Sequence, residues 1–177
     1  MIADSSRTDP IDDFSRCHSG ILSRLDAFAR LPELAVAAEQ SRMVALATLS
    51  MFEDSVLAHH SEEEGDLFPA VVRSSAAGEE RQHVQAMTER LTAEHRAIEG
   101  LWKTLKPAVK LAAGGRRSDL PEDAVAALVH AYHRHAAFEE LEFLPLARDI
   151  LGRNGNHMAA LGFSLHLRHA PQPVGYI

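Results

Sequence analysis

Histidine and glutamate occur twice in the same local pattern, His-x-x-x-Glu. The first copy is His59 with Glu63, and the second is His135 with Glu139, 76 residues later. On a helix, residues four apart lie on one face, so each copy presents an imidazole and a carboxylate one turn apart. Imidazole nitrogens and carboxylate oxygens are ligands for iron, manganese and zinc, so this pattern indicates metal chemistry.

A single histidine precedes each copy of the pattern. His18 comes before the first copy and His95 before the second, 77 residues apart. The two halves of the chain therefore repeat. Each half is expected to be a pair of helices, with one histidine on the first helix and His-x-x-x-Glu on the second.

All four of these histidines interrupt rows of apolar residues that recur at spacings of three and four. One histidine on an apolar face is more often a hydrogen-bonded core residue than a ligand, but four in register are not independent. Buried carboxylates and imidazoles without a partner cost several kcal/mol each, whereas two divalent cations would satisfy them all. The candidate metal ligands are His18, His59, Glu63, His95, His135 and Glu139. These ligand types do not choose among iron, manganese and zinc, and the lack of sulfur argues against Cu(I).

Helices must position these residues, because period-two alternation is nearly absent from the chain. We expect an all-α fold, an antiparallel up-down four-helix bundle with the histidine-bearing faces inward. The glycines of residues 114–118 predict a loop, and Pro69 predicts a break or kink. The expected helices cover roughly residues 10–30, 32–74, 79–111 and 119–151. The bundle would take up residues 1–151 and leave a C-terminal tail over 152–177.

Composition narrows the class of protein. A length of 177 residues with 46% hydrophobic content fits one domain, and a formal net charge of −7 leaves no broad basic face for nucleic acid. Cys17 is the only cysteine, as expected of a chain kept in a reducing compartment. The polar N-terminus and the lack of a long apolar run predict neither a secretory signal nor a membrane span. We therefore expect a cytoplasmic location.

The two motifs are similar to those of the hemerythrin HHE cation-binding family. The resemblance spans about residues 11–150 and rests on His18, on His59-x-x-x-Glu63-Glu64-x-x-Leu67-Phe68-Pro69, on His95, and on His135-x-x-x-Glu139-Glu140-x-x-Phe143-Leu144-Pro145. It implies a four-helix bundle that holds two iron ions, with zinc or manganese as substitutes. By this likeness the four histidines would be terminal ligands. Glu63 and Glu139 would bridge the irons beneath an oxo or hydroxo group.

One feature departs from the respiratory members of that family, which carry two histidines four apart on the third helix. Here Leu91 and Glu99 lie four residues to either side of His95, so a fifth imidazole is missing at that place. The residues that could substitute, if water does not, are Glu99, His60, Glu62 and Tyr132. On a regular helix His60 and His133 would lie about 100° and 200° from the ligand faces, which predicts surface positions for both.

Three functions suit such a centre. The first is binding or sensing of a small diatomic such as oxygen or nitric oxide, or of peroxide, with the gas or peroxide as the only partner that the sequence indicates. The second is iron handling or iron sensing without turnover. Because metal binding contributes to the free energy of folding, iron occupancy would set whether the chain is folded. The third is a detoxifying enzyme for peroxide or nitric oxide. We rank it last because no catalytic residue, organic substrate pocket or proton relay is recognisable.

Overall fold

The computed structural model describes the backbone of residues 10–153 and the side chains of residues 16–153. This part of the chain is helical and contains no strand. Its elements are α1 (Pro10–Ala29), α2 (Leu31–Ser50), η1 (Met51–Val56), α3 (Leu57–Glu62), η2 (Glu63–Leu67), α4 (Phe68–Ser74), α5 (Glu79–Ala113), α6 (Glu122–Phe138), η3 (Glu139–Phe143) and α7 (Leu144–Gly152). None of these helices has both the length and the apolar character needed to cross a membrane.

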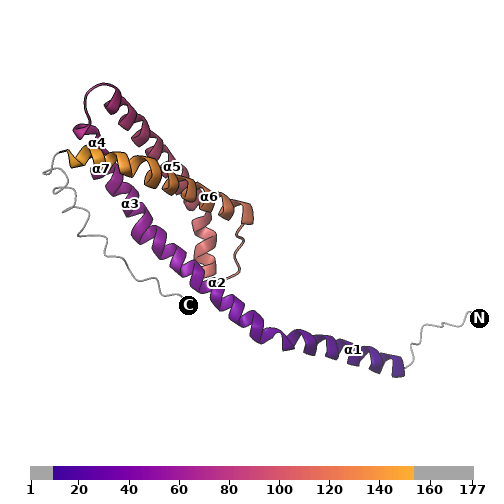
Figure 1. Cartoon of the computed structure of the whole chain (residues 1–177). Coiled ribbons are helices and arrows are strands. Elements are labelled where there is room, and N and C mark those ends of the chain that lie inside the picture. The colour runs from indigo at the N-terminus through magenta and orange to yellow at the C-terminus, as the bar shows by residue number, and fades with distance from the viewer. Residues whose placement is uncertain (1–9, 154–177) are drawn as a thin grey trace, which may run out of the picture.

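Three long helical rods make up the body of the molecule (Figure 1). The first rod runs without a loop from α2 to α4, the second is α5, and the third runs from α6 to α7. Short turns join them, so neighbouring rods run in opposite directions. The predicted loop at residues 114–118 is confirmed, whereas the last rod begins at Glu122, slightly later than the sequence suggested.

Glycines shape both turns between the rods. Gly78, at the start of α5, has φ +100°, and Gly115, at the end of α5, has φ +66°. A side chain at either position would force a strained left-handed backbone. These are the only positive φ values among the described residues.

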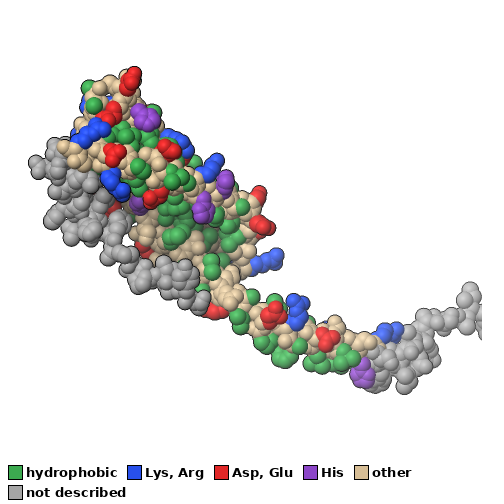
Figure 2. Space-filling model, in the orientation of Figure 1, with side chains coloured by type: hydrophobic (Ala, Val, Ile, Leu, Met, Phe, Trp, Pro, Cys, Tyr) green, Lys and Arg blue, Asp and Glu red, His purple; other side chains and the backbone are tan. Residues whose placement is uncertain are grey.

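Helix α1 does not join the three rods. It continues the line of α2 past a single turn residue, Arg30, and extends beyond the end of the body (Figure 1). Its apolar side chains stay in solvent, with Ile21 48%, Leu25 54% and Phe28 67% exposed. Figure 2 shows hydrophobic side chains, in green, along the lower side of this projecting helix. The sequence predicted that they would face a core, and here they face none.

Two apolar clusters form the core, one toward each end of the rods. Leu67, Leu91 and Phe143 belong to one cluster. Val56, Ile98 and Leu128 belong to the other, in which Phe52 and Trp102 stack with ring centroids 4.2 Å apart. Each rod contributes residues to both clusters. The histidines and glutamates of the two motifs lie between the clusters.

Three short π-helical turns, η1, η2 and η3, interrupt the rods. In each the backbone bonds from residue i+5 to residue i, as from the amide of Phe68 to the carbonyl of Glu63 and from the amide of Leu144 to the carbonyl of Glu139. Pro69 and Pro145 follow these two turns directly, so the predicted irregularity at Pro69 takes this form. A π turn holds about one residue more than an α turn and rotates every later side chain.

Candidate metal centre

Three buried imidazoles meet where the rods converge. His60 from α3, His95 from α5 and His135 from α6 are at most 1% exposed, and each offers a ring nitrogen within 4.8 Å of the others. The rings of His60 and His95 stack with centroids 3.9 Å apart, and that of His135 stands edge-on to His95 at 4.8 Å. We call these residues the inner triad.

Each imidazole of the inner triad is anchored by a glutamate from another rod or a neighbouring turn. The Nδ1 contacts are His95 with Glu64 at 2.8 Å, His60 with Glu99 at 3.2 Å and His135 with Glu94 at 3.3 Å. An ionised carboxylate only accepts hydrogen bonds, so Nδ1 carries the proton in each pair. The Nε2 lone pair of each ring is then free to point inward, the arrangement usual for metal-bound histidine.

A second group of ligands, the outer triad, adjoins the first. His59, Glu63 and Glu139 offer ligand atoms within 4.8 Å of one another. Nε2 of His59 lies 3.2 Å from Oε1 of Glu63. The two carboxylates are buried, whereas the His59 side chain is 41% exposed. The outer triad is therefore open on the side of His59.

Both carboxylates lie between the two triads. Glu63 reaches His59 with Oε1, and its Oε2 lies 3.3 Å from Nε2 of His95. Oε2 of Glu139 lies 3.8 Å from Nε2 of His135. Carboxylates placed in this way can each contact two ions, one in each triad.

The electrostatics of the centre favour neutral imidazoles at two of the three inner positions. Burial, helped by the neighbouring His95, lowers the pKa of His60 to about 4, and burial also lowers the pKa of His135. His95 differs, because Glu63 and Glu64 raise its pKa against the effect of burial. A neutral ring is what metal ligation needs, so His60 and His135 require no deprotonation near neutral pH.

The two carboxylates share their negative charge unequally. Burial, together with the nearby Glu63, raises the pKa of Glu139. Burial acts in the same direction on Glu63, but contacts with His95 and Glu139 outweigh it and lower the pKa of Glu63. Without a cation between them, one of the two carboxyls keeps a proton.

Unsatisfied polar atoms show that a cation fits this centre. Nε2 of all three inner imidazoles is buried without a hydrogen-bond partner, and so are Oε2 of Glu63 and Oε1 of Glu139. Buried polar atoms in native proteins nearly always have a hydrogen-bond partner, so five unpaired atoms in one cluster indicate a missing ligand. All five are electron-pair donors, which is the chemistry that a divalent cation satisfies.

The structure brings together five of the six ligands predicted from the sequence. His59, Glu63, His95, His135 and Glu139 converge in the two triads. His18 lies on α1, which is away from the centre, and its side chain is exposed.

The predicted surface position of His60 is wrong. The π turn of η1 precedes it and sets back the phase of the helix, so that His60 takes the inward direction that a regular helix gives His59. Phe52, Val56 and His60 are spaced by four and four, which is also a same-face spacing on a helix, so the sequence allowed the row to continue through His60 as well as through His59. His133 is exposed, as predicted.

The remaining candidates for a fifth ligand lie around the centre. Glu99 bonds to Nδ1 of His60 and so supports a ligand, and Tyr132 is half-buried with its ring centroid 6.0 Å from that of His135. Glu62 lines a cavity beside the outer triad. With His18 away from the centre, His60 joins His59, His95 and His135, so the structure brings four imidazoles together there.

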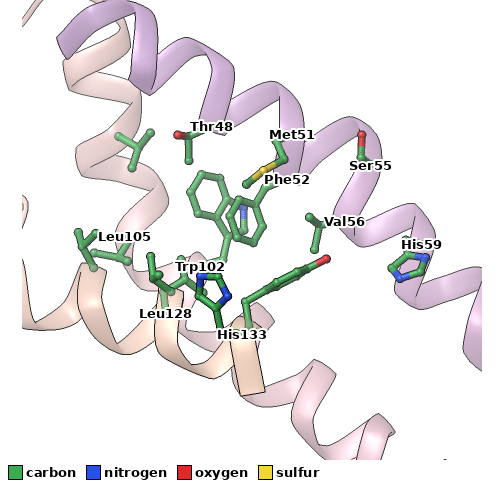
Figure 3. A pocket seen from close by; sticks show the side chains of 14 residues that line it. Thr48, Met51, Phe52, Ser55, Val56, His59, Trp102, Leu105, Leu128 and His133 are labelled. Carbon is green, nitrogen blue, oxygen red and sulfur yellow. The ribbon is translucent and has the colours of Figure 1, made fainter. Parts of the chain in front are cut away.

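Two cavities border the open side of the outer triad. A groove of about 560 Å³ runs between the first and third rods and is lined by apolar residues such as Val56, Trp102 and Leu128. His59 lies at one end of it (Figure 3). A second cavity of about 480 Å³ continues past His59 and Tyr132 to Glu139.

Comparisons with known proteins agree with this geometry. Residues 9–147 match the family described as the hemerythrin HHE cation binding domain. The chain is also similar to an uncharacterized protein of Haemophilus influenzae, with 26% identity over 159 residues that span 86% of this chain and 89% of that protein. No solved structure matches. The family match covers most of the chain, so the protein belongs to the hemerythrin HHE cation-binding family, and its His/Glu cluster is a site that can hold a metal cation.

Proposed function

We propose that the chain is a non-haem di-iron protein that binds or senses a small diatomic, oxygen or nitric oxide, or peroxide. The observation that carries the proposal is the pair of adjoining triads with both carboxylates between them. The three imidazoles of the inner triad would hold one ion and His59 the other. Glu63 and Glu139 would contact both. Two ferrous ions held side by side can each supply one electron to a small oxidant, which is the chemistry that a pair adds over a single ion.

The inner triad is buried, and the outer triad is partly exposed. Glu64, Glu94 and Glu99 fix the inner imidazoles, and the rings of His60 and His95 stack. Both cavities border the centre beside His59 and Tyr132, and the second also reaches His135. A small ligand would therefore enter along the apolar walls, which exclude water and slow its reaction with solvent.

Tyr132 supplies a hydrogen-bond donor at the entrance. Burial, with the charges of Glu63 and Glu139, raises the pKa of its phenol. The phenol therefore stays protonated at neutral pH. Because Tyr132 lines both cavities, its hydroxyl is the side-chain donor we assign to a bound diatomic or peroxide.

Iron sensing is the second candidate function, and the placement of α1 favours it. The helix that carries His18 is separate from the centre. If iron recruits His18, metal occupancy changes the fold, and another protein could recognise that change. Loss of helical packing on chelation, without any reaction of the ferrous protein with oxygen or nitric oxide, would favour this function over the first.

The test is anaerobic reconstitution with ferrous iron, followed by metal analysis and absorption spectra before and after exposure to oxygen, nitric oxide and hydrogen peroxide. We expect two iron ions per chain and a new charge-transfer band with at least one of the three ligands. A band that is lost again on removing the gas indicates reversible binding. Fewer than two ions per chain, or no spectral response to any of the three, would contradict the proposal.

A further inference from the structure

No segment among residues 16–153 fills the apolar groove beside the outer triad, and the same part of the chain carries an uncovered helix that matches the groove. Met51, Val125 and Val129 line the groove and are 38–50% exposed. Residues 10–38, which we call the arm, project from the body as helix α1 and the start of α2, and their side chains from residue 16 onward are exposed. We propose that the arm of a second copy of this chain fills the groove, and that the two copies exchange arms reciprocally.

The apolar face of the arm includes His18. Ile21, Leu25 and Phe28 follow it at spacings of three, four and three, so all four residues lie on one side of α1. An arm that buried this face in the groove would carry His18 toward His59, which lies at the end of the groove. His18 would then meet the outer triad on its open side. This part of the inference rests on the proposed metal centre.

The arm cannot reach the centre of its own chain by folding at the existing break. A reversal at Arg30 would set His18 level with residue 42, about 17 residues short of His59, or roughly 25 Å along a helix. For His18 to lie level with His59 in an antiparallel pair, the chain must reverse near residues 37–41. That segment is an uninterrupted part of α2.

The sequence of that segment favours a straight helix over a turn. The corresponding turn in the second half uses Gly114 and Gly115, but residues 33–64 contain neither glycine nor proline. Alanines and a Glu39–Arg42 ion pair of 2.6 Å strengthen the helix there. Exchange between two copies fills both grooves without breaking this helix, whereas folding back in one chain requires a break.

The register makes the exchange self-complementary. When His18 of one copy lies level with His59 of the partner subunit, the two long helices run antiparallel and their midpoint falls between Ala38 and Glu39. Residue pairs on either side of that point are then related by two-fold symmetry. Ala35, Ala37 and Ala38 lie near the axis, where small side chains let two helices approach closely.

The buried area suffices for a stable dimer. A helix of about 29 residues is roughly 43 Å long and 10 Å wide. Burying half of its side surface, together with an equal area of the groove, removes roughly 1,300 Å² from solvent. Two exchanged arms would bury roughly 2,700 Å², which exceeds the 1,200–2,000 Å² of ordinary stable interfaces.

Disulfide trapping between differently tagged chains tests the exchange. One chain carries Leu25→Cys in the arm and the other carries Met51→Cys in the groove, both in a Cys17→Ser background. These two positions lie within one residue of level in the proposed register, and both side chains are partly exposed, so the substitutions leave the core intact. The matched control replaces Leu25→Cys with Ser23→Cys, on the opposite face of the same helix.

We expect co-expressed chains to form a disulfide between the two tags, and much less of it with the control. Light scattering should give the mass of two chains. An intrachain disulfide in a monomer that carries both Leu25→Cys and Met51→Cys, without the mixed product, would show that the arm folds back on its own chain and would overturn the proposal. Absence of both disulfides would overturn it as well.

A complementation experiment tests the role of His18 separately. A mixed dimer of His18→Ala and Glu63→Ala chains contains one complete centre only if His18 is supplied by the other chain. Neither parent contains a centre with all of its ligands, although His18→Ala chains keep their inner triads. We therefore expect the mixed dimer to give half of the two-iron charge-transfer band of the unsubstituted dimer, and each parent to give less. If the mixed dimer gives no more of this band than its parents while the disulfide still forms, His18 is not a ligand. Failure of the proposed function would instead leave the unsubstituted protein without iron.

Discussion

The inner and outer triads are adjacent, but the fold supports them to different degrees. Three rods bring together the inner imidazoles, each of which is buried and anchored by a glutamate. The outer triad has two buried carboxylates, but its one imidazole is 41% exposed beside an open groove. The comparison teaches that packing among the three rods encloses the inner group of side chains, whereas the outer group is left open on the side of His59.

Removing the carboxylate that touches both triads should have the largest effect. Glu63→Ala takes away contacts to His59 and His95, so both ions lose a ligand. We expect the iron content to fall from two ions per chain to fewer than one, measured by metal analysis after ferrous reconstitution. Asp66→Ala, an exposed acid three residues later, is the control and should keep two ions. Retention of two ions by Glu63→Ala would mean that Glu63 joins neither site.

Adjacent histidines should separate the two sites. His60→Ala should remove the inner ion and His59→Ala the outer one, because consecutive residues belong to different triads. We expect about one ion per chain in each variant, with the larger loss of thermal stability for His60→Ala, whose ring is buried against His95. His133→Ala provides an exposed control. If only His59→Ala lost iron, the inner triad would be an ordinary packed cluster.

The anchoring glutamates should affect affinity more than stoichiometry. Glu64→Ala removes the acceptor that fixes the His95 ring, and loss of such a partner typically weakens metal binding by about 10-fold to 100-fold. Competition with a chelator of known affinity measures the change. Glu89→Ala, an exposed acid on the same helix as His95, is the matched control. An unchanged affinity for Glu64→Ala would show that the contact between Glu64 and His95 does not hold the imidazole in place for metal binding.

The shared proton of the carboxylates predicts a pH dependence of the metal-free protein. The pKa of Glu139 is raised in the folded state, so the folded chain holds a proton that the unfolded chain releases near the ordinary value of 4.5. Its contribution to stability is therefore complete below that value and is lost as pH rises toward the raised pKa. Urea unfolding from about pH 7 to about pH 8.5 should show falling stability, to which the raised pKa of His95 contributes in the same direction. Glu139→Gln should flatten that slope, and an equal slope in both proteins would refute the assignment.

Tyr132 should give the smallest effect, confined to the ligand. Tyr132→Phe removes a hydroxyl but no metal ligand, so iron content should stay at two ions per chain. Loss of one hydrogen bond of about 1 kcal/mol should speed dissociation of a bound diatomic by about fivefold. Stopped-flow release of nitric oxide measures this rate. An unchanged rate would show that the hydroxyl does not reach the ligand.

The repeat and the local patterns of the sequence account for most of the fold. Spacings of three and four gave the helices, and Gly114 and Gly115 gave the main loop. The two His-x-x-x-Glu motifs and His95 correctly predicted five residues of the centre. They did so because the repeat indicates that the corresponding helix faces of the two halves face each other. The break between the two helices predicted for residues 10–30 and 32–74 lies at Arg30, as the sequence indicates.

The misplaced features have two physical causes. His60 was assigned to the surface because a helical wheel assumes 100° per residue, and the π turn before it breaks that assumption. To bring His18 to the centre of its own chain, the helix would have to reverse direction within α2. Residues 33–64 contain no glycine or proline that would favour such a turn, so the local sequence does not bring His18 there. The predicted C-terminal tail, with its histidines at 157, 166 and 169, lies outside the described residues.

Anomalous diffraction at the iron absorption edge, on crystals of the ferrous-loaded protein, tests the central claim most directly. We expect two peaks per chain, one among the Nε2 atoms of His60, His95 and His135 and one beside His59, with Glu63 and Glu139 between them. A single peak, or iron bound elsewhere while these six side chains meet around no ion, would contradict it.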